Sequence, residues 1–290
     1  MFSVVVKSAL CRTSQTVGRG GVARIQPQTR RLQIARAFSI LPKNLQPTAE
    51  ELTQATVTTK TGTYDIATPP ADVRADVWAL AVSTMMRIDP KNLRQPKKSV
   101  LHWLLQHAES RAELDVALDL MLHWRMHMLP ITQATTQIWA EACIRLEQPD
   151  LFVAMLMDRW KYRQLPISYN MAKFIKFLGA KGRLDDAFRL FALYPYYGLK
   201  YDAQAYGALV EACCAQAEEE AWRRALVAGE EALAHDPPLI TLEALRVLEA
   251  RSAEKGESEM AQRYKSLADS LPQQPTTPKE ARFDDDGNLI

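Results

Sequence analysis

Apolar residues along most of this chain recur at the three- and four-residue spacing of amphipathic helices, from about residue 71 onwards. Alternating β-branched patterns typical of strands are nearly absent from this part of the chain. Residues 39–70 lack helical periodicity and are rich in Thr, Pro and Gln, which predicts an extended N-terminal arm. The pattern predicts eleven helices, over residues 72–86, 99–109, 112–126, 133–146, 150–161, 169–180, 184–194, 203–216, 219–234, 239–253 and 258–271.

The helices after residue 98 fall into five pairs of similar length, which indicates internal repetition. Small or apolar residues in the second helix of each pair are spaced by 36, 34, 38 and 36 residues, at Ala117, Val153, Ala187, Ala225 and Ala261. Gly182 and Gly256, which interrupt two of the pairs, lie 74 residues apart. A period near 35 with two helices per unit is typical of an α-solenoid. We therefore expect an all-α fold, a right-handed α-solenoid of about five helix-turn-helix repeats within residues 71–271. The alternative is an irregular helical bundle.

The N-terminal segment has the composition of a targeting sequence. Residues 1–49 contain no Asp or Glu, whereas seven Lys and Arg residues are spread over residues 1–38. An Arg-rich, hydroxyl-bearing and acid-free segment is typical of a mitochondrial transit peptide. A secretory signal is disfavoured because the apolar run at residues 2–6 is followed at once by Lys7. We expect residues 1–38 to be a cleavable presequence that directs the chain to the mitochondrial matrix. The alternative is a basic arm that binds nucleic acid.

The charge of the chain is unevenly distributed. The whole chain carries 36 Lys and Arg against 34 Asp and Glu, but without residues 1–38 the balance becomes 29 against 34. Residues 39–200 then have a net charge of +4 and residues 201–290 a net charge of −9. Residues 272–290 are expected to form a disordered acidic tail. No apolar run reaches 18 residues, so no membrane span is predicted.

Three stretches near the middle of the chain resemble a pentatricopeptide repeat: residues 168–170 (Ser-Tyr-Asn), 180–187 (Ala-Lys-Gly-Arg-Leu-Asp-Asp-Ala) and 198–202 (Gly-Leu-Lys-Tyr-Asp). The spacing from the Tyr of the first stretch to the Gly of the second is two residues longer than the family pattern. The resemblance implies a helical-repeat protein that binds single-stranded RNA in an organelle. A narrower similarity, over about residues 112–200, is to pentatricopeptide-type proteins of the mitochondrial ribosomal small subunit.

The resemblance also implies candidate base-reading residues. In the family, the residue after the opening Tyr and the last residue of the repeat read one base together, and here these are Asn170 and Asp202. The alternative is that both side chains cap helices, since Asn and Asp favour that position.

A basic belt lies at residues 159–200, which hold nine basic residues and two acidic ones. Trp160 and Tyr162 interleave with its first basic residues. Such a belt can bind several RNA phosphates, and the alternative is a solvated face. The residues predicted to contact RNA here are Arg159, Lys161, Arg163, Lys173, Lys176, Lys181 and Arg183. A second basic cluster comprises Arg87, Lys91, Arg94, Lys97 and Lys98.

Other reactive residue types form no recognisable chemical site. His123 and His127 lie four residues apart without a third ligand, which favours packing or surface histidines. Cys143, Cys213 and Cys214 form no Cys-x-x-Cys pair, so buried free thiols are expected. No phosphate loop, dinucleotide-binding Gly pattern or nucleophile elbow occurs. We therefore expect no enzymatic activity, no cofactor, no metal site and no small-molecule substrate.

These observations together predict a structural, RNA-contacting component of the mitochondrial ribosomal small subunit. Its partners would be mitochondrial ribosomal RNA and neighbouring ribosomal proteins. Two alternatives remain open: a free mitochondrial pentatricopeptide RNA-processing or translation factor, and a tetratricopeptide-like protein scaffold for respiratory-complex assembly. The acidic balance of the chain after residue 38 favours the scaffold, whereas the basic belt favours RNA.

Overall fold

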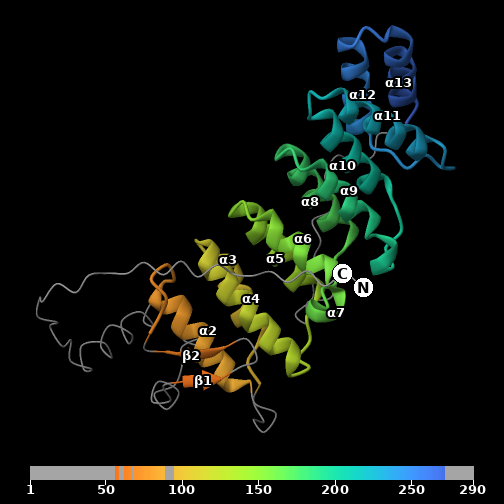
Figure 1. Cartoon of the computed structure of the whole chain (residues 1–290). Helices are drawn as coiled ribbons and strands as arrows, with labels where there is room; N and C mark the ends of the chain where they lie inside the picture. Colours follow the sequence, from red (N-terminus) through yellow and green to blue (C-terminus); the bar gives the residue numbers. More distant parts are fainter. Residues whose placement is uncertain (1–55, 59–61, 67, 89–94, 272–290) are drawn as a thin grey trace, which may run out of the picture.

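The computed structural model describes residues 56–58, 62–66, 68–88 and 95–271 (Figure 1). The expected presequence, the acidic tail, and Lys91 and Arg94 of the second basic cluster lie outside these residues. Within the described residues the protein is predominantly α-helical, as the hydrophobic pattern predicts. No helix among them is long and apolar enough to cross a bilayer.

Twelve α-helices follow one another in the described residues: α2 (Ala75–Arg87), α3 (Lys98–His107), α4 (Arg111–Met126), α5 (Gln133–Arg145), α6 (Pro149–Met157), α7 (Arg159–Tyr162), α8 (Ser168–Ala180), α9 (Leu184–Ala192), α10 (Ala203–Cys214), α11 (Glu219–Leu233), α12 (Leu242–Glu254) and α13 (Ser258–Ser270). A single 3₁₀ turn, η1 (Pro195–Tyr197), follows α9. One expected helix, over residues 150–161, is wrong, because it is divided at Asp158 into α6 and α7. The Asp158 carboxylate accepts a hydrogen bond from the backbone N–H of Lys161 at 3.0 Å, which starts a new turn.

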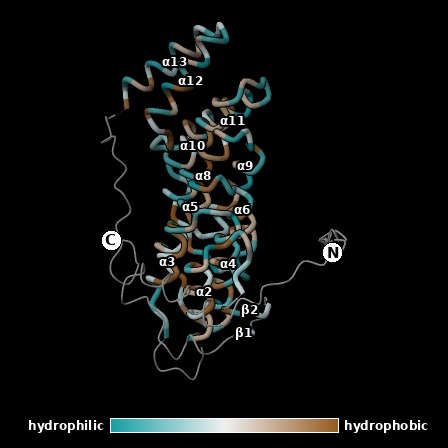
Figure 2. Tube along the Cα trace, turned by 90° about the vertical axis from the view of Figure 1, so that its left-hand side faces the viewer, coloured by the Kyte–Doolittle hydropathy of each residue, from teal (hydrophilic) through white to brown (hydrophobic). Residues whose placement is uncertain are grey.

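The helices form an elongated array of two layers (Figures 1 and 2). Helices α3, α5, α8, α10 and α12 make one layer, and α4, α6, α9 and α11 make the other (Figure 2). Each first-layer helix packs on the next first-layer helix along the array. Apolar residues lie mainly between the helices, where the core includes the fully buried rings of Trp124, Trp139, Phe152, Phe174 and Tyr206. The array thus buries each helix pair against its neighbours.

Local sequence signals set the starts of the first-layer helices. Thr132, Asp202 and Thr241 each accept a hydrogen bond from a backbone N–H in the first turn, and so cap α5, α10 and α12. These hydrogen bonds occupy donors that a helix start would otherwise leave without partners. The caps lie directly before the expected starts of α5 and α10, whereas α12 begins three residues later than expected, at Leu242.

One turn geometry recurs between the two helices of a pair. Gly182 and Gly256 have φ angles of 72° and 79°, the left-handed region that glycine adopts without strain. The residue after each of them donates its backbone N–H to a carbonyl five residues earlier, at 2.9 Å in both turns. Glu147 occupies the same position between α5 and α6 with a φ of 53°, 35 residues before Gly182. The left-handed turn between α5 and α6 is therefore not visible in the sequence, because Glu147 stands where the other two turns have Gly.

Two glycines allow first-layer helices of successive pairs to approach each other closely. Gly179 on α8 faces Ala212 on α10, where an added Cβ atom would lie 2.4 Å from the Ala212 Cβ atom. Gly207 on α10 similarly faces Thr241 at the start of α12, at 2.6 Å. Gly179 and Gly207 thus allow close contact between first-layer helices, whereas Gly182 and Gly256 form turns.

The N-terminal part of the array carries a small β-hairpin. Strands β1 (Thr56–Thr58) and β2 (Thr63–Asp65) pair antiparallel, within the arm expected to be extended. The Tyr64 hydroxyl donates to the Asp119 carboxylate on α4 at 2.7 Å, and the Trp78 indole on α2 donates to the Asp65 carbonyl at 2.7 Å. Arg74, just before α2, forms an ion pair with Glu113 on α4 at 2.8 Å. Helix α2 is thus integrated into the array.

Candidate nucleic-acid interface

The nine residues predicted to contact RNA lie in three different settings. Four of the basic residues are on or beside α8 and pair with acids of other helices. Asn170 and Asp202 belong to the packing between α8 and α10. Arg159, Lys161 and Arg163 lie on and after the single-turn helix α7. These settings differ in charge and in exposure, so they differ in what they can bind.

Two lysines of α8 link neighbouring helix pairs. The Lys173 ammonium lies 3.6 Å from the Glu141 carboxylate on α5. The Lys176 ammonium lies 2.8 Å from the Glu211 carboxylate on α10. Both ion pairs are partly exposed, so each contributes at most about 1 kcal/mol. Their effect is to neutralise this face of α8 with carboxylates from both neighbours.

The turn after α8 is neutralised in the same way. The Lys181 ammonium lies 2.7 Å from the Glu147 carboxylate in the preceding turn. The Arg183 guanidinium contacts Asp150 at 2.6 Å and Asp186 at 2.5 Å. The acids that pair with this half of the basic belt come mostly from residues before it in the sequence. The charge count over residues 159–200 therefore overstates the free positive charge that this half offers to RNA.

The proposed base-reading pair lies inside the packing. Asp202 caps α10, accepting the Ala205 backbone N–H at 2.8 Å, and it also accepts the Ser168 hydroxyl at 2.5 Å. Asn170 lies within α8 with only 2% of its surface exposed. The alternative interpretation, that both residues cap helices, is confirmed for Asp202 and wrong for Asn170. Base reading by this pair stays a prediction, and it requires the Asn170 side chain to leave the core.

The remaining basic residues lie on and after α7, which packs beside α4 and α6 at the edge of the array (Figure 1). This surface, here named the α7 corner, is formed by Arg125, Met128, Met157, Arg159, Trp160, Lys161, Arg163 and Tyr196. The break at Asp158 turns the chain away from the axis of α6, and Arg163 ends α7 with a left-handed φ of 45°. The corner therefore exists because the expected long helix is interrupted.

Arg159 is held in place by the 3₁₀ turn η1. Its guanidinium donates a hydrogen bond to the backbone carbonyl of Tyr196. The same guanidinium lies 5.5 Å from the ring centre of Tyr196 and 5.4 Å from that of Tyr197, within the range of cation–π attraction. Lys161 similarly lies 4.9 Å from the ring centre of Tyr162. These partners orient the cations but do not neutralise them.

The cations of the α7 corner form no close ion pair among the described residues, although the Asp158 carboxylate caps α7 and the Asp119 carboxylate on α4 attracts Lys161. Arg125, Arg159, Lys161 and Arg163 form none of the ion pairs found in this part of the chain. The pKa of Arg125 is lowered by burial and by the positive charge of Arg163 nearby. Two arginines that repel each other mark a surface where an anion would be stabilised.

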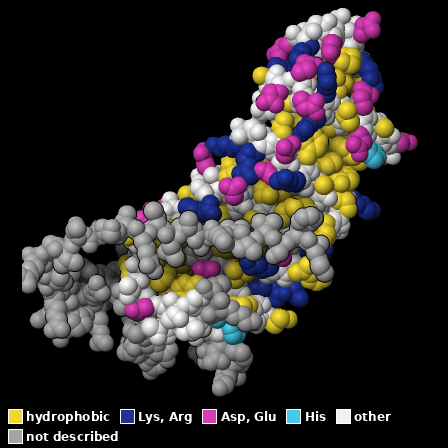
Figure 3. Space-filling model, in the orientation of Figure 1, with side chains coloured by type: hydrophobic (Ala, Val, Ile, Leu, Met, Phe, Trp, Pro, Cys, Tyr) yellow, Lys and Arg dark blue, Asp and Glu magenta, His cyan; other side chains and the backbone are white. Residues whose placement is uncertain are grey.

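The same corner exposes large apolar side chains. Trp160 is 80% exposed, Met128 73% and Met157 52%. An indole contributes roughly 4–6 kcal/mol when about 150–250 Å² of it is buried, so a Trp left in water forgoes most of that stabilisation. Figure 3 shows Lys and Arg side chains beside hydrophobic ones in the region where Figure 1 places α7. An exposed patch of this kind is typical of a binding surface.

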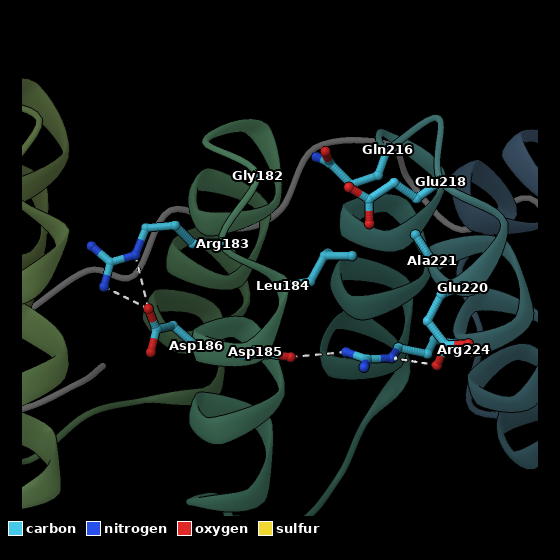
Figure 4. Close-up of a pocket in the computed structure, with 10 residues that line it drawn as sticks. All are labelled: Gly182, Arg183, Leu184, Asp185, Asp186, Gln216, Glu218, Glu220, Ala221 and Arg224. Atoms are coloured by element: carbon cyan, nitrogen blue, oxygen red, sulfur yellow. Dashed lines mark hydrogen bonds and ion pairs between the residues drawn. The ribbon is translucent and has the colours of Figure 1, made fainter.

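A polar cleft of about 350 Å³ lies between α9 and α11 (Figure 4). Arg224 forms ion pairs within this cleft, with Asp185 at 2.9 Å and Glu220 at 3.2 Å. A neighbouring groove of about 410 Å³ is more apolar and includes Phe188 and the 68% exposed Val227. The cleft offers little unpaired charge, and the groove offers an apolar contact surface.

The histidines and cysteines take no part in the α7 corner. The His123 and His127 rings lie 4.6 Å apart, and burial, followed by the charge of His127, lowers the pKa of His123. No group of three or more potential metal ligands occurs within the described residues. The prediction of buried free thiols is confirmed for Cys143, Cys213 and Cys214, and burial raises the pKa of Cys213 and Cys214 to about 12.

Sequence analysis missed Arg125, Met128 and Tyr196 as parts of this surface. They come from the end of α4 and from η1, which lie more than 30 residues before and after α7 in the chain. Met128 and Tyr196 have one local signal, an apolar or aromatic side chain outside the α-helices, whereas Arg125 lies within α4 and has none. No protein-family model matches the chain, and no curated protein matches it at a significant level.

Proposed function

We propose that the protein is a structural, RNA-contacting component of the mitochondrial ribosomal small subunit. In this proposal the two-layered array is a right-handed α-solenoid of about five pentatricopeptide- or tetratricopeptide-like repeats. The observation that carries the proposal is the α7 corner, a basic and aromatic surface whose cations form no ion pair among the described residues, whereas the four cations on and beside α8 are paired.

The repeated turn geometry supports the solenoid. Left-handed residues at positions 147, 182 and 256 are separated by one and by two periods of about 35. Ion pairs and close helix contacts between successive pairs give each unit the neighbour that it needs to bury its faces. Such an array acts by holding surfaces at fixed distances, which suits a docked component.

The distribution of charge supports an assembly with two kinds of neighbour. The α7 corner is suited to phosphates, whereas residues 201–290 carry a net charge of −9. An acidic end attracts basic proteins, and a basic corner attracts RNA. The matrix location rests on the acid-free, Arg-rich composition of residues 1–38.

Sucrose-gradient fractionation of a matrix extract tests the proposal. The protein is expected to sediment with the small subunit and to move to the top of the gradient after ribonuclease digestion. A protein that stays at the top in the untreated extract would refute the proposal. Crosslinking that recovers messenger RNA instead of ribosomal RNA would support a free RNA factor in its place.

A second candidate function is a protein scaffold for respiratory-complex assembly. The apolar groove between α9 and α11, with Phe188 and the exposed Val227, favours this alternative. Replacing Val227 by Asp tests it, because a charge in the groove would weaken an apolar protein contact. Retained small-subunit association in this variant, together with loss in a variant of Arg159, Lys161 and Arg163, would favour the ribosomal proposal.

A further inference from the structure

We infer that the α7 corner binds an unpaired segment of RNA, with Trp160 stacking on one base and the surrounding basic side chains holding the adjacent phosphates. The inference rests on the proposed function and specifies its ligand: single-stranded or bulged RNA, contacted at the edge of the second helical layer. It places the contact away from Asn170 and Asp202, which lie in the packing between α8 and α10.

The α7 corner concentrates positive charge. Arg125, Arg159, Lys161 and Arg163 bring four positive charges to one corner, and no acid of the described residues forms an ion pair with them. Arg125 and Arg163 lie close enough for the charge of Arg163 to lower the pKa of Arg125. A polyanion relieves this repulsion, and a phosphate backbone provides negative charges at regular intervals.

Trp160 adds a flat, exposed indole to the same surface. Trp160 lies between Arg159 and Lys161 in α7, and its indole is 80% exposed. Base stacking on an aromatic residue, with phosphates on neighbouring cations, is the general mode of single-strand binding. In a duplex the bases stack on one another, so their faces are not available to an indole. The exposed Trp therefore favours an unpaired base over a helix.

Contacts within the protein already hold α7 and the Arg159 side chain in place. Asp158 caps α7, and the Arg159 guanidinium is held by the Tyr196 carbonyl and by the rings of Tyr196 and Tyr197. A cation that is already oriented loses less conformational freedom when it binds a phosphate. An acidic peptide would also match the positive charge, but it has no planar group to stack on the indole. RNA satisfies both features of the corner.

Fluorescence anisotropy of the full-length chain with a short labelled RNA lacking secondary structure tests the inference. Trp160→Ala is expected to weaken binding of single-stranded RNA by about tenfold, and Trp160→Phe to weaken it less. The triple variant Arg159→Gln, Lys161→Gln and Arg163→Gln is expected to reduce the slope of log affinity against log salt by about 2. Residues 1–55 are identical in every variant, so their contribution cancels.

Two controls match these changes at the other end of the array. Val227→Ala removes an apolar side chain that is 68% exposed on α11. Arg223→Gln, Arg246→Gln and Lys265→Gln together remove three exposed positive charges from α11, α12 and α13. Both controls are expected to bind RNA as the parent protein does. All variants are expected to keep the parent melting temperature, because the changed side chains lie at the surface.

Corner variants that bind like their controls would overturn the inference. Equal affinity for duplex RNA, with the same dependence on Trp160, would overturn the assignment to an unpaired strand. The gradient separates the inference from the proposed function. If the parent protein is free of the small subunit but binds RNA through Trp160, the ribosomal proposal is refuted and the inference about the α7 corner stands. If every corner variant still associates with the small subunit and binds RNA as tightly as the parent protein, the inference is refuted and the ribosomal proposal stands.

Discussion

Replacing Gly179 by Ala is expected to destabilise the protein, because α8 and α10 cross at this residue with almost no space between them. An added Cβ atom would lie 2.4 Å from the Ala212 Cβ atom and 2.5 Å from its Cα atom. Non-bonded carbon atoms lie about 3.5–4.0 Å apart at their optimal separation. The two helices would therefore have to separate by about 1 Å to accommodate the methyl group.

Two contributions of opposite sign determine the change in stability. In a helix without neighbours, Ala is more favourable than Gly by about 0.8–1.0 kcal/mol. Overpacking a dense core costs about 1–3 kcal/mol, and here the upper part of that range applies because the obstacle includes backbone atoms. The net loss in the free energy of unfolding is about 1–2 kcal/mol. In a domain of this size it lowers the melting temperature by roughly 2–8 °C.

Gly229→Ala is the matched control, since it makes the same change in the interior of α11. There the added Cβ atom would approach only the terminal Leu248 Cδ1 atom, at 3.0 Å, and that side chain can move aside. The control is expected to melt at the parent temperature or above it, as followed by circular dichroism at the helical band. If Gly179→Ala melts no lower than Gly229→Ala, the close crossing of α8 and α10 is refuted.

Three other sites are expected to respond in directions that their surroundings determine. Arg74→Ala is expected to cost about 2–3 kcal/mol at neutral pH, because the Glu113 side chain is only 2% exposed and loses its charged partner. The loss is smaller than for a fully buried pair, since Arg74 is 36% exposed and backbone N–H donors remain on Glu113. Burial opposes ionisation of Glu113, but Arg74 and backbone N–H donors lower its pKa below the usual 4.5. This stabilisation is complete above the unfolded-state pKa and disappears as the pH falls through the folded-state pKa. Denaturant titrations must therefore show a smaller difference between parent and variant in acid, and a constant difference would contradict the ion pair. Asp202→Ala removes the α10 cap and is expected to lower the free energy of unfolding by about 1 kcal/mol. Asp202→Asn keeps a capping oxygen and is expected to lower it less. Equal losses in the two variants would exclude capping. Cys213 and Cys214 are expected to react slowly with iodoacetamide in the folded protein, because burial raises their pKa to about 12. Labelling as fast as in the unfolded chain would show that the thiols are exposed.

Local signals explain why the helices could be predicted closely. Thr132, Asp202 and Thr241 cap helices, Pro149 begins one, and Gly182 and Gly256 end two of them. Each acts on backbone groups within a few residues, so its effect is visible in the sequence. Asp158 is the exception, because it lies in an otherwise helical pattern and its capping role appears only when α7 turns away.

The charge of the basic belt could not be predicted in the same way. Residues 159–200 form a cationic run in the sequence, yet Lys173 and Lys176 face the carboxylates of Glu141 and Glu211. Those acids lie about 30–35 residues from their partners, one helix pair away in the chain. Stacking brings equivalent positions of successive pairs side by side, so a count along the chain separates charges that the fold joins.

The sequence by itself determined the helical class, the places where most helices begin and end, the spacing near 35 residues and the acid-free N-terminal segment. These properties depend on side chains and backbone groups that are neighbours along the chain. Only the tertiary structure decided which cations are neutralised and which remain free at the α7 corner, and that Asn170 is buried while Trp160 is exposed. Electrostatic pairing and burial depend on distance in space, and here many ion pairs join residues that lie more than 30 residues apart in the chain.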